Sequence, residues 1–139
     1  MMVKYLLASH GSFCEGTLSF LKIMMGVPEN LYVMTAFLDN EPIGKKVEDK
    51  LKEIGEFDQL IVFCDIHGGS VQQEIFRQTQ IDSRNVQIIS GYNIPLVMDI
   101  MFKGRELTDD EIRESIRESR EAIVFTKDFC VTDTDDDLF

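Results

Sequence analysis

Residues 3–25 read VKYLLASHGSFCEGTLSFLKIMM, and the pattern of apolar residues changes within this stretch. The first seven residues are mostly apolar and end in a short polar turn, which favours a buried strand. After the turn, apolar residues recur every three or four positions, as on one face of an α-helix: Cys14, Leu18, Leu21 and Met25. A strand followed directly by an amphipathic helix indicates the first half of a βαβ unit.

The same alternation of strand and helix continues along the chain. Further strands are expected at residues 31–37, 59–65, 86–90 and 122–125, after the first at residues 3–9. Between them lie segments of helical period, which is the pattern of stacked βαβ units. The sequence therefore predicts an α/β fold, with a doubly wound, mostly parallel five-stranded sheet and helices on both faces.

Four more helices are expected from apolar stripes and from start signals. The second and third have buried stripes at Ile43, Val47, Leu51 and Ile54, and at Val71, Ile75 and Thr79. Pro95 sits where a first-turn proline would open a fourth helix. Thr108 and Glu111 have the spacing of a capping box, which predicts the start of a fifth.

The size and composition of the chain predict one domain. Its 139 residues are 44% hydrophobic, which is enough for a core without disulfides or metals. No interdomain linker or repeat interrupts the pattern, so residues 1–139 are expected to form a single domain. An acidic cluster near the C-terminus predicts a flexible tail from about residue 128, and it consists of Asp133, Asp135, Asp136 and Asp137.

The charge of the chain excludes several classes of partner. A formal net charge of −11 repels nucleic acid and anionic lipid headgroups. No apolar run approaches the roughly 20 residues that span a bilayer, and the N-terminus has no signal-peptide pattern. We therefore expect a soluble, cytoplasmic protein.

The three cysteines are interpreted as reduced, buried thiols without a catalytic role. Cys14, Cys64 and Cys130 lack the spacing of a disulfide framework or of a zinc site.

Both histidines of the chain fall at the ends of expected strands. In an open parallel sheet, ligands bind beyond the carboxyl ends of the strands, near the place where the strand order reverses. The segments at those ends are residues 9–11, 65–70 and 91–93. They contain His10 and His67, so this edge is where we expect the chemistry.

His10 has the setting of a nucleophile toward phosphorus. It is expected on a strand-to-helix turn, where backbone N–H groups and the helix dipole attract an anion and Gly11 permits close approach. One ring nitrogen must be unprotonated, which is arranged when the other donates its proton to a fixed acceptor. Asp65, at the end of a neighbouring strand, is the expected acceptor, and its charge would also stabilise the phosphoimidazole cation.

Gly68, Gly69 and Ser70 open the third helix and are expected to form a second phosphate-binding loop. The chain contains no P-loop and no dinucleotide-binding glycine motif. We therefore expect no nucleotide or other cofactor, and a phosphoryl donor that is another protein.

Two other interpretations of these residues remain open. His10, Asp65 and His67 could be three metal ligands of a hydrolase, although no fourth ligand is identifiable and we assign no metal. A His-Gly pair or an Asp at a strand end can also be merely a polar turn or a helix cap.

Three segments together match a known family. Residues 6–11 (LLASHG), 62–70 (VFCDIHGGS) and 90–96 (SGYNIPL) resemble the enzyme IIA domain of the mannose-class (mannose/fructose/sorbose) sugar phosphotransferase system. They lie in the order and at the spacing of that family, and the last two dozen or so residues match weakly. Family members often carry an aromatic residue, commonly Trp, where this chain has His67.

The resemblance implies a fold, a reaction and partners. The fold is a doubly wound domain that forms a homodimer by exchanging an edge strand. HPr would phosphorylate the outward nitrogen of His10, Asp65 would orient the ring, and residues 68–70 would close over the phosphate. The phosphoryl group would then pass to enzyme IIB and, at the membrane permease, to sugar. Because no IIB domain follows in this sequence, the expected acceptor is a separate polypeptide.

Two alternatives to sugar phosphotransfer use the same histidine. A similar domain donates the phosphoryl group to a dihydroxyacetone kinase subunit. A non-catalytic regulator would instead hold the phosphate on His10 as a signal of sugar supply.

Overall fold

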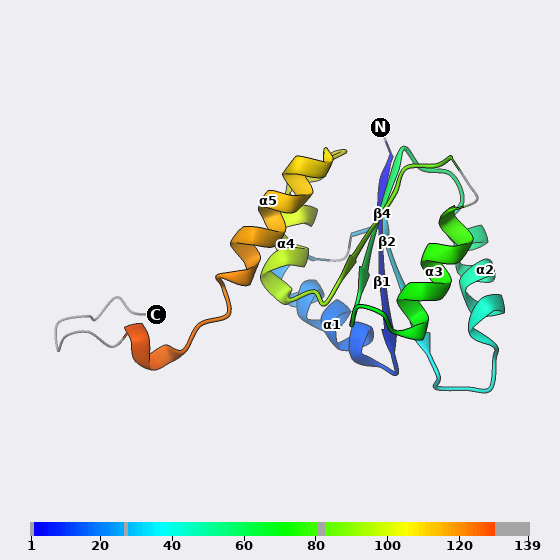
Figure 1. Ribbon diagram of the computed structural model, residues 1–139, viewed down its shortest axis with the longest axis horizontal. Helices are drawn as coiled ribbons and strands as arrows, with labels where there is room; N and C mark the ends of the chain where they lie inside the picture. Colours follow the sequence, from blue (N-terminus) through cyan, green and yellow to red (C-terminus); the bar gives the residue numbers. More distant parts are fainter. Residues whose placement is uncertain (1, 27, 81–82, 130–139) are drawn as a thin grey trace.

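The computed structural model describes residues 2–26, 28–80 and 83–129 (Figure 1). The strands are β1 (Val3–His10), β2 (Leu31–Ala36), β3 (Gln59–Cys64) and β4 (Val86–Ser90). The helices are α1 (Phe13–Met25), α2 (Ile43–Ile54), α3 (Ser70–Gln80), α4 (Ile94–Lys103) and α5 (Asp109–Arg120), followed by a short 3₁₀ helix, η1 (Thr126–Phe129). Strand and helix alternate up to α4, as the sequence predicts.

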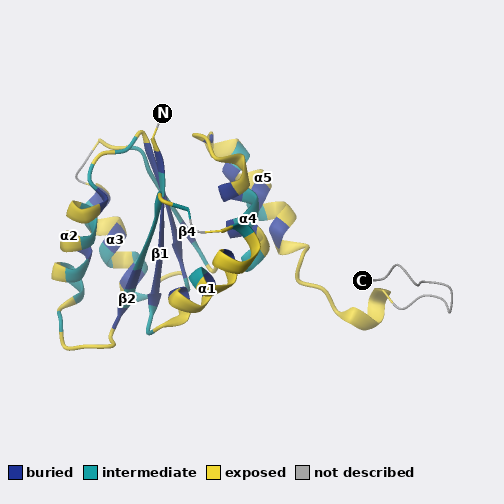
Figure 2. Ribbon diagram, turned by 180° about the vertical axis from the view of Figure 1, so that it is seen from behind, coloured by how far each residue is buried: buried dark blue, intermediate teal, exposed yellow. Residues whose placement is uncertain are grey.

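The strands form one parallel sheet in the order β2-β1-β3-β4. Helices α1, α4 and α5 cover one face of the sheet, while α2 and α3 cover the other (Figures 1 and 2). The chain moves outward from β1 to β2 and then returns to β3 on the other side of β1. The strand order therefore reverses between β1 and β3, and the fold is doubly wound.

Two apolar cores lie on the two faces of the sheet. Leu7, Ile61 and Phe63 pack toward α1, α4 and α5, whereas Leu6 and Val62 pack toward α2 and α3. All six residues of β3 are buried. A central parallel strand is covered on both faces, so its continuous apolar sequence serves both cores at once.

The helix start signals in the sequence are confirmed. The Asn93 side chain accepts a hydrogen bond from the backbone N–H of Leu96, and Pro95 lies in the first turn of α4. Thr108 and Glu111 form the reciprocal capping box of α5. Each cap satisfies a backbone donor that has no partner within the helix, which defines where the helix begins.

A buried amide connects the α4–α5 loop to the central strand. The Gln59 side chain donates to the carbonyl of Leu107 at 2.9 Å and accepts from its N–H at 2.8 Å. An unpaired buried backbone group costs about 1–3 kcal/mol, so this pair of bonds fixes the loop against the sheet.

The prediction of a fifth strand is wrong for the single chain. Residues 122–125 form the end of a turn and an irregular segment, and the sheet of the described residues has four strands. Ile123 is 77% exposed and Phe125 is 66% exposed, because the segment leads away from the body of the molecule (Figures 1 and 2). High strand propensity is not sufficient here, since a strand also needs a neighbour with which to pair.

The structure describes only part of the chain for two further expectations, the flexible acidic tail and the lack of a membrane span. Of the acidic tail, Asp128 and Phe129 belong to η1, and the four aspartates from Asp133 onward lie outside the described residues. Within the described ranges, no helix is both long and apolar enough to cross a membrane.

Candidate functional site

The reversal of strand order brings His10 and Asp65 together. His10 is the last residue of β1, and Asp65 follows the last residue of β3. These two strands are hydrogen-bonded neighbours, with Ala8 opposite Cys64 at their carboxyl ends. The connections that follow lead to helices on opposite faces, which leaves an opening between them.

His10 and Asp65 make two contacts with each other. Asp65 Oδ2 accepts a hydrogen bond from the backbone N–H of His10 at 2.9 Å and lies 2.9 Å from its Nδ1. An ionised carboxylate can only accept, so Nδ1 carries the proton in the neutral ring. Nε2 is then left with its lone pair, which is the form required of a nucleophile.

Asp65 is held in its charged form. Its side chain is only 14% exposed, and this burial raises the pKa of the carboxyl group. Hydrogen bonds from the backbone and ring of His10 and from the N–H of Ile66 outweigh the burial and keep the pKa below the ordinary value of 3.8. The stabilisation from this charge is therefore present at all pH above 3.8 and is lost as the pH falls through the lowered value.

The loop before α3 lies against the outward side of the imidazole. Ser70 Oγ is 3.4 Å from Nε2, which is longer than a normal hydrogen bond. A Cβ atom on Gly69 would stand only 3.1 Å from Cε1 of His10, so with any other residue the loop or the imidazole would have to move by a few tenths of an ångström. Gly68, with φ 76°, donates its N–H to the Gln72 side chain.

Ser70 begins α3, and the N–H groups of its first turn have no partner within the helix. Together with the positive end of the helix dipole, they favour an anion at this edge of the sheet. Of the three loop residues expected from the sequence, Gly69 and Ser70 lie beside the His10 ring, whereas the N–H of Gly68 is bonded to Gln72.

Gly11 has a different setting from the one expected. Its N–H donates to the carbonyl of Ala36 at 2.7 Å, so in this structure the amide is engaged in extending the β1–β2 pairing. Its φ of 59° turns the chain from β1 into α1. The buried Ser9 hydroxyl then accepts the N–H of Cys14 and donates to the Gly11 carbonyl, which holds that turn.

Phe37 is the residue at the site that sequence reasoning missed. It follows β2 and stacks on the His10 ring with centroids 5.3 Å apart and planes at 25°. The only signal in the sequence is its place at the end of an expected strand, residues 31–37, which pairs with β1 in the structure.

A comparison with protein families identifies the chain. The family model described as the PTS system fructose IIA component, EIIA-man, matches residues 4–118. The chain belongs to this family. It is the mannose-class enzyme IIA family of the sugar phosphotransferase system (PTS), whose members are phosphoryl-transfer components.

Solved structures of PTS components have a similar fold. A protein from Klebsiella pneumoniae, described as a candidate phosphoenolpyruvate-dependent sugar PTS permease, is 28% identical with a TM-score of 0.82, covering 94% of this chain and 96% of that one. An EIIA component from Streptococcus agalactiae is 21% identical, with a TM-score of 0.80 and coverage of 91% and 99%. A mannose/sorbose-specific IIA subunit from Enterococcus faecalis is also 21% identical, with a TM-score of 0.72 and coverage of 90% and 95%. These last two show likeness of fold. A comparison with curated proteins found no match.

The two cysteines near the site of this enzyme IIA are buried in its core. Cys14 and Cys64 are free and buried, as expected from the sequence. Burial raises the pKa of both thiols, that of Cys64 to about 12, and a thiol that stays protonated is a poor nucleophile. Cys130 lies outside the described residues.

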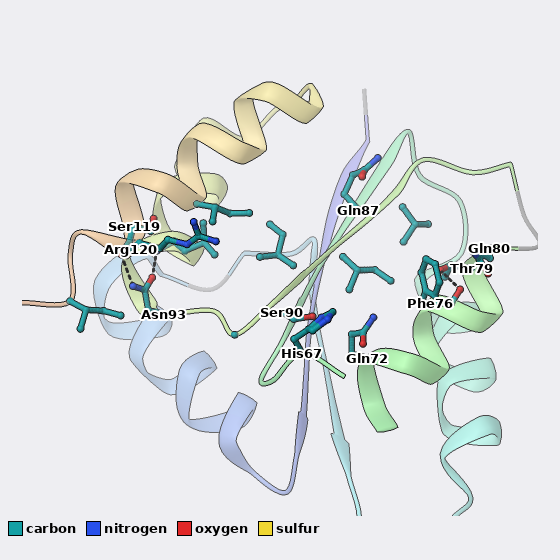
Figure 3. Close-up of a pocket in the computed structure, with 17 residues that line it drawn as sticks. His67, Gln72, Phe76, Thr79, Gln80, Gln87, Ser90, Asn93, Ser119 and Arg120 are labelled. Atoms are coloured by element: carbon teal, nitrogen blue, oxygen red, sulfur yellow. Dashed lines mark hydrogen bonds between the residues drawn. The ribbon is translucent and has the colours of Figure 1, made fainter. Parts of the chain in front are cut away.

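His67 belongs to the same loop as Asp65 and Gly69, and it lines a groove of about 840 Å³ along the outer edge of β4 (Figure 3). Phe76 of α3 and Arg120 of α5 stand on opposite sides of the groove, and Gln87 of β4 lies between them. Among the described residues, no three His, Cys, Asp or Glu side chains are grouped as metal ligands, so the structure does not assemble the hydrolase set that includes His67.

Proposed function

We propose that this enzyme IIA is a cytoplasmic phosphocarrier that accepts a phosphoryl group from phosphorylated HPr on Nε2 of His10. It then passes the group to a separate enzyme IIB, which serves a membrane permease. The observation that carries the proposal is the 2.9 Å contact between Nδ1 of His10 and Asp65, because it leaves Nε2 unprotonated beside a loop suited to an anion. Residues 1–139 act as a single domain in this proposal.

The proposed transfer needs no proton from outside the site. The Nε2 lone pair attacks phosphorus, the bond between phosphorus and the donor breaks, and Nδ1 keeps its proton. The ring becomes a cation, which the Asp65 carboxylate stabilises at 2.9 Å. Ser70 and the first-turn amides of α3 receive the phosphoryl oxygens, so the protein supplies placement and electrostatic stabilisation.

A relay assay tests the function. The chain is incubated with HPr carrying labelled phosphate, freed of excess donor, and then mixed with an enzyme IIB. We expect label on this chain and its transfer to IIB. Transfer only to a dihydroxyacetone kinase subunit would replace the sugar pathway with the kinase alternative. Label that passes to neither acceptor would favour the non-catalytic regulator, and absence of label would overturn the phosphocarrier proposal.

We also propose a homodimer in which residues 122–125 of each copy pair with β4 of the other. Three observations support it: β4 has one strand neighbour among the described residues, the groove of about 840 Å³ follows its free edge, and residues 123–125 expose apolar side chains. Such an edge favours pairing with another chain, and reciprocal exchange closes a two-fold dimer.

We predict that the chain sediments at micromolar concentration with twice its mass of 16.0 kDa. Val124→Pro should shift it to the monomer, because proline cannot donate a ladder hydrogen bond. Val124→Thr, which preserves strand propensity, is the matched control and should remain dimeric. A wild-type mass near 16.0 kDa would count against the exchange.

A further inference from the structure

Phe37 combines an unfavourable backbone conformation with an exposed aromatic ring. Its φ of 65° is the only positive value for a non-glycine residue in the described ranges. Side chains with a Cβ rarely adopt this left-handed conformation, which costs conformational free energy. The side chain is also 54% exposed, so burial in the core does not explain why a phenylalanine stands here. Strain of this kind is concentrated at functional sites.

The left-handed conformation gives Phe37 a contact with the imidazole of His10. The β1–β2 pairing runs to His10 opposite Ala36, and the N–H of Gly11 donates to the Ala36 carbonyl. Phe37 comes directly after this last bond. Its ring stacks on that of His10, with centroids 5.3 Å apart and planes inclined by 25°.

The stack complements the other contacts of the imidazole. Asp65 holds Nδ1 at 2.9 Å, and Gly69 lies close to Cε1. A single hydrogen bond leaves the ring free to tilt about its axis, whereas an aromatic ring on one face fixes the plane. The electron-rich face of a phenyl ring also favours the cation that phosphorylation creates.

We propose that Phe37 is a positioning residue that sets the plane of the His10 imidazole and thereby aims Nε2 at the incoming phosphorus. This inference rests on the proposed function, since it concerns the same nitrogen. It differs from a docking role, in which an exposed phenylalanine contacts the donor protein. A positioning residue lowers the rate with bound donor, whereas a docking residue raises the KM.

A phosphoryl donor without a protein surface separates the two roles. With phosphoramidate, Nε2 attacks phosphorus, the P–N bond of the donor breaks, and ammonia leaves. We expect Phe37→Asn to slow labelling of His10 about tenfold with phosphoramidate, and by a similar factor with saturating phospho-HPr. Phe37→Tyr keeps the ring face and should restore the wild-type rate. Asn tolerates a positive φ, so this variant should melt at or above the wild-type temperature, which excludes unfolding as the cause.

Phe13 provides a matched control. It is an exposed aromatic residue at the same edge and contacts Tyr92 instead of His10. Phe13→Asn should leave the phosphoramidate rate unchanged. If Phe37→Asn loses rate only with phospho-HPr, or with neither donor, Phe37 is not a positioning residue. If the wild type is labelled by phosphoramidate and not by phospho-HPr, the proposed donor is wrong while the Phe37 comparison stands. A wild type labelled by neither donor would overturn both.

Discussion

Replacing His10 with alanine should abolish phosphoryl acceptance from HPr. The variant lacks Nε2, which lies 3.4 Å from Ser70 Oγ and forms the covalent bond to phosphorus in the proposed reaction. The side chain of His10 is 38% exposed, and the backbone N–H that bonds to Asp65 remains, so the fold should survive. Mass spectrometry under conditions that preserve phosphohistidine is the measurement.

The same experiment on His67 provides the comparison. His67→Ala should still be labelled at residue 10, because His67 lines the groove along β4. Label that persists in His10→Ala and maps to His67 would show that the wrong histidine has been assigned.

Asp65→Asn should slow the phosphorylation of His10 by roughly tenfold or more, equal to about 1.4 kcal/mol of transition-state stabilisation. With its oxygen toward His10, the amide still accepts both hydrogen bonds from that residue and loses only the one from the N–H of Ile66, so the melting temperature should fall modestly. It brings no negative charge to the phosphoimidazole cation, and if the amide turns round it favours the wrong tautomer of His10. Single-turnover labelling with phospho-HPr measures the rate.

A chelator distinguishes this role of Asp65 from metal binding. With phospho-HPr purified away from the enzyme that charged it, the wild-type rate should not respond to the chelator. Loss of activity on chelation would restore the metal interpretation of His10, Asp65 and His67. An Asp65→Asn variant with the wild-type rate and melting temperature would show that the carboxylate merely shapes the turn.

The structure confirms most elements, and the differences share one cause. The predicted ends of β1, β2 and β3 were each off by a single residue, because a sequence does not show where the last ladder bond forms. The prediction of a fifth strand was wrong for the same reason, since strand formation depends on a partner that a sequence does not show. Residues 122–125 have the composition of a strand, yet none of the strands in the described ranges pairs with them.

At the site, the contact between His10 and Asp65 was predictable, whereas the contacts of Gly11 and Phe37 were not. A histidine and a carboxylate at strand ends identified His10 and Asp65. Gly11 was expected to offer its amide to phosphate, but the pairing with Ala36 uses that amide. The contact of Phe37 with His10 was not predictable, because it depends on the left-handed backbone conformation of Phe37 itself in the loop after β2.

Local chemistry in the sequence determined which residues form strands and helices, where α4 and α5 begin, and which side chains lie at the carboxyl edge of the sheet. Those properties depend on apolar periodicity and on caps within a few residues, so they can be read without a partner segment. The tertiary structure brings Asp65 to His10 across 55 residues of chain, as expected. It alone decided that Phe37 stacks on His10 and that β4 has one strand neighbour among the described residues. These contacts arise from strand order and register, which are set by the packing of all the layers together.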